Sequence, residues 1–385
     1  MKRILTLIII GAISFATAAC TDINVKHPAK FVMKPYLQAL TKTGVTVLAE
    51  TNTQDSVTVV VNNADSEKIA EFYTHHSVET NAKYRSFVHR IKIKGLAAGQ
   101  TYNYYCVVNK DTSAKAAFGT LVDQGESFKF ALMGDCRSNP ETHSICADKI
   151  ASHNPLFSLY GGDLCMSASY NSWKEEFFTD AELNLSASVP FFNTPGNHEG
   201  LEINTKAFTQ AVSPNSGNPD YYSFDCGNIH YLVLNSECSL GRGSEEYKFI
   251  KKDLSETSAQ FKIAIFHIPA YCGGGHGESS DMIRITTELL EPADVDLVVS
   301  GHSHFYQKNF INGIYHIVIA GGGAPLYTPK DKDYTLKSVK DYHYAIVDSD
   351  STSMTITVYN LEDKVLDVIE LQSAEEKILN RIEED

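Results

Sequence analysis

Residues 295–304 read VDLVVSGHSH, an apolar run that ends in a glycine and two histidines. The apolar part, Val295 to Ser300, predicts a buried β-strand. Four other apolar runs also end in residues that bind metals or transfer protons: Phe128 to Met133 before Gly134-Asp135-Cys136-Arg137, Pro155 to Tyr160 before Gly162-Asp163, Val189 to Asn193 before Gly196-Asn197-His198-Glu199, and Phe261 to Phe266 before His267. Functional groups collect at the carboxyl ends of the strands in open α/β sheets, so we expect these side chains to meet at one edge.

These side chains form a set of hard and borderline metal ligands. The set comprises Asp135, Asp163, Asn197, His267, His302 and His304. Carboxylate, amide and imidazole groups in this combination suit two divalent or trivalent cations that lie about 3.5–4 Å apart. The sequence therefore predicts a dinuclear metal hydrolase.

The length and charge of the chain narrow the classes of function. The 385 residues are enough for two domains with separate cores, and a hydrophobic content of 43% indicates a folded chain. The formal net charge is −14, which argues against nucleic acid as the main partner. An acidic surface does not exclude a small phosphate-ester substrate, because bound metals reverse the sign of the local field.

The first twenty residues have the pattern of a secretory signal. Lys2 and Arg3 are followed by an apolar stretch from Ile4 to Phe15 and by small residues up to Cys20. We expect residues 1–20 to be a signal peptide and Cys20 to be the acylated residue of a periplasmic or cell-surface bacterial lipoprotein. Thr17 stands where such signals prefer leucine, so export as a secreted soluble protein is the alternative. No other stretch is long and apolar enough to span a bilayer, so we expect contact with a membrane through a lipid anchor only.

Two regions with different patterns follow the signal. From about residue 25 to 122, short alternating strands separated by turn residues predict an antiparallel β-sandwich. Residues 127–372 alternate strands with helical stretches at Ser172 to Leu183 and Ser244 to Ser255, which indicates an α/β domain. Residues 373–385 predict a solvated acidic tail.

Seven cysteines remain beyond Cys20, and an odd number cannot all pair. They show no CxxC spacing, which excludes a zinc finger or a redox motif of that type. Some could form disulfides in an oxidising compartment. Buried free thiols that act as small apolar residues are the expected state of most of them.

The order of the motifs resembles a known superfamily. Gly-Asp, Gly-Gly-Asp, Gly-Asn-His-Glu, a histidine before Ile268-Pro269, and Gly-His-Ser-His follow one another as in the calcineurin-like metallophosphoesterases. The piece from Gly95 to Tyr104 resembles a fibronectin type III module, which points to the purple acid phosphatase-like branch. Gly321 to Tyr327 and Tyr306 fit the same resemblance. The resemblance implies a four-layer α/β sandwich, in which helices flank two central mixed sheets, preceded by an all-β fibronectin-like sandwich.

The resemblance also implies which ligands hold each metal. Metal one would be bound by Asp135, Asp163 and His304. Metal two would be bound by Asp163, Asn197, His267 and His302. Asp163 would bridge the two, since a carboxylate can bind one cation with each oxygen.

Other residues of the motifs are implied to act on the substrate. His198 matches a family histidine that lies beside the substrate phosphate, where it stabilises charge or protonates the leaving oxygen. Glu199 is expected either to orient His198 or to cap the next segment. His276 lies in a glycine-rich loop where plant enzymes of this branch place substrate-contacting histidines, although a plain surface histidine is the alternative.

The chain departs from the family pattern at two positions. Met166 stands where purple enzymes have a tyrosine whose phenolate colours the ferric site, and a thioether is a poor ligand for ferric iron. We therefore expect a colourless protein. Arg137 stands where the superfamily often has a histidine ligand, and a guanidinium cannot coordinate a metal. Arg137 is expected either to clamp a phosphate oxygen of the substrate or to pair with a nearby carboxylate.

These inferences predict an exported enzyme that hydrolyses phosphate monoesters in the manner of an acid phosphatase. A hydroxide shared by two ions of iron, manganese or zinc would be the attacking group. A phosphodiesterase on the same metal core is the first alternative. A catalytically degenerate surface binding protein is the second, in which the N-terminal domain would hold a glycan or a partner. That domain could also be a spacer that shapes the entrance to the active site.

Overall fold

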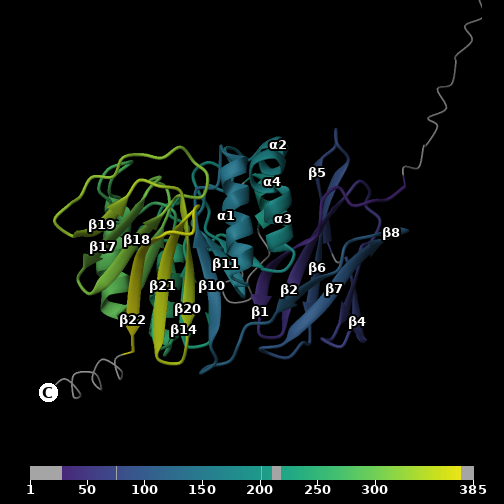
Figure 1. Cartoon of the computed structure of the whole chain (residues 1–385), viewed down its shortest axis with the longest axis horizontal. Coiled ribbons are helices and arrows are strands. Elements are labelled where there is room, and N and C mark those ends of the chain that lie inside the picture. The colour runs from purple at the N-terminus through teal and green to yellow at the C-terminus, as the bar shows by residue number, and fades with distance from the viewer. Residues whose placement is uncertain (1–27, 75, 201, 210–217, 374–385) are drawn as a thin grey trace, which may run out of the picture.

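The structure is a computed structural model, and it describes residues 28–74, 76–200, 202–209 and 218–373 (Figure 1). The predicted signal peptide, the predicted acylation of Cys20 and nearly all of the predicted tail at 373–385 lie outside the described residues. Within these ranges, no helix is both long enough and apolar enough to cross a membrane.

The largest sheet has ten strands and is mixed. Its order is β22 (Val365–Gln372), β21 (Ser353–Asn360), β20 (His343–Ser349), β10 (Phe128–Met133), β11 (Phe157–Tyr160), β12 (Phe191–Asn193), β1 (Tyr36–Thr41), β2 (Gly44–Thr51), β6 (Ser86–Lys94) and β5 (His76–Asn81). The pairs β10–β11 and β11–β12 are parallel, whereas β20 is antiparallel to β10. The carboxyl ends of β10, β11 and β12 therefore lie at one edge of this sheet.

A second sheet of seven strands supplies the other half of the α/β domain. Its order is β13 (Tyr222–Cys226), β14 (Ile229–Val233), β15 (Phe261–Ile265), β16 (Leu297–Ser300), β18 (Ile314–Ile319), β17 (Tyr306–Ile311) and β19 (Thr335–Val339). The strands β14, β15, β16 and β18 run parallel to one another. Every residue of β14 and β16 is buried, as expected for parallel strands that are covered on both faces.

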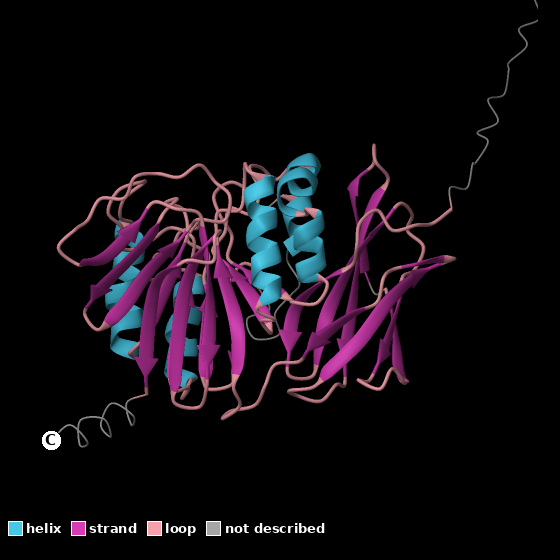
Figure 2. Cartoon of the chain, viewed as in Figure 1, coloured by secondary structure: helices cyan, strands magenta, loops and turns pink. Residues whose placement is uncertain are grey.

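The helices cover the outer faces of the two sheets in two separate groups (Figure 2). One group comprises α1 (Pro140–Ser152), α2 (Tyr170–Ser172), the π-helical turn η1 (Trp173–Phe177), α3 (Asp180–Ser186) and α4 (Ile203–Thr209). The other comprises α5 (Glu245–Glu256), α6 (Ser280–Ile285), the π-helical turn η2 (Thr286–Leu290) and the 3-10 turn η3 (Glu291–Ala293). The order of layers is therefore helix, sheet, sheet, helix, and it confirms the predicted four-layer sandwich.

Apolar side chains fill the spaces between these layers. Phe130, Phe157 and Val299 belong to the cluster that lies between the two sheets. A second cluster packs the first sheet against α1 and η1, and a third packs the second sheet against α5 and α6. The helix ends are capped as their sequences predict: the Ser244 side chain accepts a hydrogen bond from the Tyr247 N–H at the start of α5.

The β-rich N-terminal region is joined to the α/β domain within one sheet. A third sheet of the molecule belongs to this region alone. It contains β4 (Lys68–Tyr73), β3 (Thr58–Asn62), β7 (Thr101–Val108) and β8 (Asp111–Thr112), with β9 (Ala116–Gly119) also paired to β7. The other strands of the region extend the ten-stranded sheet, because β1 pairs with β12 in parallel at Gln38 and Phe191. The predicted domain limits at 25–122 and 127–372 stay a prediction, but the two regions share a continuous sheet and a continuous core.

One sequence prediction about the helices is wrong in detail. Ser172 to Leu183 does not form a single helix, because the π-helical turn η1 ends at Phe177 and the next residue, Phe178, has a non-helical ψ of 55°. A new helix, α3, then begins after Thr179, whose side chain accepts a hydrogen bond from the Glu182 N–H. A threonine in this position caps a new helix N-terminus better than it continues an old helix.

The cysteines follow the prediction. All seven in the described region are free, and only Cys238 is exposed.

Candidate metal centre

The six predicted ligands lie in loops that directly follow strands of the two sheets. The loops after β10, β11 and β12 in the first sheet carry Asp135, Asp163 and Asn197, and the loops after β15 and β16 in the second sheet carry His267, His302 and His304. The carboxyl edges of both sheets therefore bring the six side chains together. Their role as ligands stays a prediction.

Three of these residues have a left-handed backbone. The φ angles are 56° for Asp135, 53° for Asp163 and 68° for His302. Such values are uncommon outside glycine and cluster at functional sites, where the surrounding structure must hold them. Here the His302 N–H lies 3.1 and 2.9 Å from the two carboxylate oxygens of Asp135 and donates to them. The loops thus fix one another across the two sheets.

Gly301 shows how closely these loops approach. A Cβ atom at this position would lie 2.5 Å from Asp135 Oδ2 and 2.6 Å from the Gly161 carbonyl oxygen. Since real Cβ atoms do not come so close to other atoms, only glycine fits between the two loops. The glycine of the quoted motif is therefore required by packing.

Asp135, Asp163 and His304 form the first half of the centre, which we call the first subsite. One ligand atom from each lies within 4.8 Å of the others, and all three residues are buried. His304 Nδ1 lies 2.8 Å from the Pro325 carbonyl oxygen, which can only accept a hydrogen bond. The proton is therefore on Nδ1, and the lone pair of Nε2 faces Asp135 Oδ1 at 3.4 Å.

Asp163, Asn197, His267 and His302 form the second subsite. His267 Nε2 lies 3.1 Å from Asn197 Oδ1, 3.3 Å from Asp163 Oδ1 and 3.2 Å from His302 Nδ1. His267 Nδ1 lies 2.7 Å from the Gly161 carbonyl oxygen and donates to it, so Nε2 is the ring atom that faces the other three residues. Four atoms that can ligate a metal thus converge on one point.

The charges of the second subsite balance one another. Burial lowers the pKa of His267, but the negative charge of Asp163 outweighs it and raises the pKa to about 10, so a metal ion that binds Nε2 must first displace a proton. Burial and the neighbouring His267 lower the pKa of His302 to about 3, so this ring is neutral, as a metal ligand must be. Both subsites therefore have donor sets that fit a divalent or trivalent metal ion.

His198 lies beside the Asp163 carboxylate. Its backbone N–H donates to Asp163 Oδ1 at 3.0 Å. Its Nδ1 lies 3.1 Å from the Met166 carbonyl oxygen, so Nδ1 carries a proton, while Nε2 lies 3.8 Å from Asp163 Oδ2. The ring is partly exposed, so a substrate can reach it.

Among the described residues, the Glu199 side chain bonds to a partner that neither expected role includes. Its Oε1 accepts a hydrogen bond of 3.2 Å from the Leu164 N–H in the loop that carries Asp163. The side chain is buried, and burial together with the charge of Asp163 raises its pKa to about 8. Glu199 therefore supports the backbone of the Asp163 loop.

His276 lies next to the second subsite. Its ring centroid is 4.3 Å from that of His302 and 5.4 Å from that of Tyr327, and its side chain is exposed. Tyr327 in turn stacks on His304 at 4.3 Å. The sequence quoted as Gly321 to Tyr327 pointed to this segment but did not indicate that Tyr327 covers a ligand.

Arg137 lies among the predicted ligands of the first subsite, a position that the sequence did not indicate. Its guanidinium is buried and lies inside the first subsite, with Nε 3.3 Å from Asp163 Oδ2 and Nη2 3.3 Å from His304 Nε2. Its Nη1 donates to Ser138 Oγ at 3.1 Å and approaches Met166 Sδ at 3.4 Å. Of the two roles expected from the sequence, pairing with a carboxylate is the one that this geometry contains.

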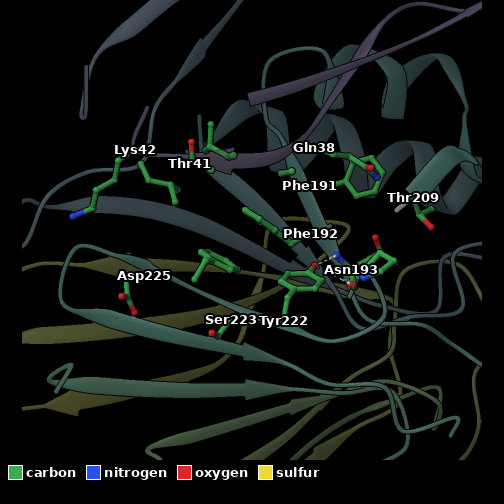
Figure 3. A pocket seen from close by; sticks show the side chains of 15 residues that line it. Gln38, Thr41, Lys42, Phe191, Phe192, Asn193, Thr209, Tyr222, Ser223 and Asp225 are labelled. Carbon is green, nitrogen blue, oxygen red and sulfur yellow. Dashed lines mark hydrogen bonds between the residues drawn. The ribbon is translucent and has the colours of Figure 1, made fainter. Parts of the chain in front are cut away.

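A cavity elsewhere in the molecule does not belong to this centre. It has a volume of about 250 Å³ and lies where β1, β12 and β13 meet (Figure 3). Phe191, Phe192 and Tyr222 line it, and the Tyr222 hydroxyl donates to the Asn193 carbonyl oxygen at 3.1 Å. None of the predicted site residues lines this cavity, which we assign to the junction of the two regions.

The comparisons with known proteins agree with this geometry. Residues 128–306 match the sequence model of the family described as Calcineurin-like phosphoesterase. The chain therefore contains a metallophosphoesterase domain of the calcineurin-like superfamily.

Its curated relatives are purple acid phosphatases. Purple acid phosphatase 18 of Arabidopsis thaliana is 29% identical over 217 residues, which are 50% of this chain and 49% of that protein. Purple acid phosphatase 22 of the same plant is 28% identical over 262 residues, which are 61% of this chain and 58% of that protein. The match thus spans about half the length of these relatives. These relatives support the purple acid phosphatase-like branch of the superfamily.

A solved structure has the same fold over most of the chain. The purple acid phosphatase PPD1 from yellow lupin (Lupinus luteus) seeds superposes with a TM-score of 0.77 at 18% identity. The match covers 90% of this chain and 75% of the lupin chain. The β-rich N-terminal region is therefore included in the shared fold.

Proposed function

We propose that the protein hydrolyses phosphate monoesters at the centre formed by the two subsites. The observation that carries this proposal is the convergence of Asn197, Asp163 and His302 on His267 Nε2. Two further predicted ligands, Asp135 and His304, lie directly beside this group and share Asp163 with it. The family and the purple acid phosphatase relatives support a metal-dependent phosphoric ester hydrolase.

The subsites suit two ions of iron, manganese or zinc. When bound, these ions supply positive charge at the phosphate oxygens and favour the loss of a proton from water. The first would be held by Asp135, Asp163 and His304, and the second by Asp163, Asn197, His267 and His302.

His198 is the residue that we propose to act on the substrate itself. The Met166 carbonyl oxygen holds Nδ1 in its protonated form, so Nε2 is the ring atom that faces the centre. A protonated Nε2 donates a hydrogen bond to the ester and then a proton to the leaving oxygen. The Met166 carbonyl stabilises the doubly protonated ring in this step, because it accepts from Nδ1–H.

A cavity beside the centre offers room for the organic part of a small ester. It has a volume of about 460 Å³ and is lined by Gly275, His276, Leu326, Tyr327, Thr328 and Lys340. His276 and Tyr327 border both this cavity and the ligand histidines. We propose that they contact the leaving group, and that this open space favours monoesters of small alcohols or phenols.

Export is part of the proposal and rests on the sequence of residues 1–20. The N-terminal pattern favours a lipid-anchored protein with Cys20 acylated, acting on small phosphate esters outside the cytoplasm.

The test is hydrolysis of p-nitrophenyl phosphate by the purified chain after removal of metals with a chelator and refilling with manganese, iron or zinc. We expect activity only with metal, and a loss of activity in His198→Ala at unchanged metal content. Bis(p-nitrophenyl) phosphate serves as the diester control. Faster hydrolysis of the diester would show that the protein is a phosphodiesterase and not a phosphomonoesterase. Inactivity on both esters in protein that holds metals would contradict the proposal.

A further inference from the structure

The side chain of Arg137 satisfies two atoms that a metal in the first subsite would need. Asp163 Oδ1 faces His267 in the second subsite, so Oδ2 is the oxygen left for the first subsite. This Oδ2 accepts from Arg137 Nε at 3.3 Å. The lone pair of His304 Nε2 accepts from Arg137 Nη2, also at 3.3 Å.

These contacts prevent His304 Nε2 from binding Arg137 and a metal ion at the same time. The Pro325 carbonyl fixes the proton of His304 on Nδ1, so Nε2 has a single in-plane lone pair. That lone pair can bind an N–H of Arg137 or a metal ion, but not both. A guanidinium keeps its charge at all relevant pH values and cannot become a ligand. Arg137 and a metal therefore compete for the first subsite.

The second subsite has no such competitor. Its ligand atoms are Asp163 Oδ1, Asn197 Oδ1, His267 Nε2 and His302 Nδ1. Across the described part of the chain, no lysine or arginine side chain hydrogen-bonds to any of these four atoms. A cation that enters there displaces no lysine or arginine side chain.

We propose that Arg137 is a resident cation of the first subsite and makes the affinity of this subsite for metal lower than that of the second. The protein holds one metal firmly in the second subsite, and it takes a second metal only when Arg137 leaves Asp163 and His304. Burial at 8% exposure makes the resident arginine a strong competitor, because its hydrogen bonds to a carboxylate are little weakened by water. This inference rests on the proposed metal centre but does not require that phosphate monoesters are the substrates.

Measurement of the number of bound metal ions tests the inference without an activity assay. Chelator-stripped protein is dialysed against increasing Mn²⁺, and bound metal is measured by elemental analysis, with Mn²⁺ EPR to detect coupled pairs of ions. We expect the wild-type protein to bind one ion first and a second ion with an affinity lower by roughly tenfold to hundredfold. In Arg137→Gln the second step should tighten by a similar factor, and the coupled EPR signal should appear at lower Mn²⁺.

Three further variants keep the outcome interpretable. Arg242→Gln removes the same charge from an exposed ion pair with Glu288 and should leave both steps unchanged. His304→Ala should abolish the weak step, and His267→Ala should abolish the tight step. Circular dichroism of each variant shows that it is folded.

Several outcomes would overturn the inference. Equal affinity for two ions in the wild-type protein would do so, as would unchanged second-step affinity in folded Arg137→Gln, or loss of the tight step in His304→Ala. The failure of the proposed function is separate, because it would appear as inactivity on phosphate esters in protein that still binds metal in these two steps.

Discussion

The Glu176 carboxylate accepts a hydrogen bond of 3.1 Å from the backbone N–H of Met166. The same Oε2 atom accepts from the Ser138 N–H at 2.7 Å, and Oε1 accepts from Ser172 Oγ at 2.5 Å. One side chain of η1 therefore ties together the loop after Asp135 and the loop after Asp163. The second of these loops also provides the carbonyl that orients His198.

We predict that Glu176→Ala slows turnover without removing the metals. The two loops lose their shared acceptor, and small shifts of a positioned group lower kcat by up to about a hundredfold. KM and the number of bound metals should change little. Steady-state kinetics together with metal analysis check this prediction. Glu175→Ala, an exposed neighbour in the same turn, is the matched control. A Glu176→Ala protein with wild-type kcat would show that Glu176 has no positioning role.

His198→Ala should lower kcat by roughly 10²-fold or more, which is the usual contribution of a positioned acid or base. The loss should be smaller for substrates with good leaving groups, because these need less help from a proton donor. A series of aryl phosphates of decreasing phenol pKa measures this dependence. If the loss were the same across the series, His198 would stabilise charge on the phosphate instead of protonating the leaving oxygen.

The protein loaded with ferric iron should be colourless. Met166 occupies the position of the tyrosine whose phenolate colours the purple enzymes, and its thioether is 47% exposed and lies against Arg137. A thioether is a poor ligand for a hard ferric ion. The visible absorption spectrum tests this, with Met166→Tyr as the comparison that should gain a band. A visible band in the wild-type protein would contradict the prediction.

The positions of the ligands could be predicted from the sequence because they depend on local patterns. Apolar runs such as Phe157 to Tyr160 are buried at every position, which is typical of central parallel strands. The glycine and acidic residue that follow then lie at the carboxyl edge. The resemblance added the assignment of ligands to two subsites, which stays a prediction; the structure places Asp163 within reach of both groups of residues.

The remaining features depend on contacts between residues that are distant in sequence. Arg137 and His304 are 167 positions apart, and no periodicity or motif brings a guanidinium to an imidazole. The strands of the two regions pair at one registered position, Gln38 with Phe191, which no strand pattern marks. Side chains with these roles, Glu176 among them, resemble ordinary surface residues in the sequence.

The junction of the two regions also contains a buried charged group, Glu50 of β2. Its carboxylate is fully buried and accepts hydrogen bonds of 2.6 Å from both Tyr170 Oη and Lys174 Nζ. We predict that Glu50→Ala destabilises the protein by about 3–5 kcal/mol, because it leaves Lys174 without its partner in a poorly hydrated place. Urea unfolding measures the loss. Glu50→Ala combined with Lys174→Met should recover part of it, and a double variant no more stable than Glu50→Ala would contradict the role of the ion pair.

His230 in β14 should make the stability of the fold depend on alkaline pH. Its Nδ1 lies 2.7 Å from Asp225 Oδ1 and its Nε2 lies 2.8 Å from Asp253 Oδ2. Burial lowers the pKa of His230, but the two carboxylates outweigh it and raise the pKa from 6.5 to about 9. The folded state therefore binds the proton more tightly than the unfolded state. The stabilisation is fully present below pH 6.5 and is lost as the pH rises through about 9.

We predict that His230→Gln lowers the free energy of unfolding by roughly 2–3 kcal/mol more at about pH 6 than at about pH 10. Urea unfolding at several pH values in this range measures the difference. His316→Gln in β18 is the matched control, because burial lowers the pKa of His316 to about 3 and this ring stays neutral throughout. The effect of His316→Gln should be independent of pH. A difference between wild type and His230→Gln that stays constant with pH would show that His230 is not held in its charged form by Asp225 and Asp253.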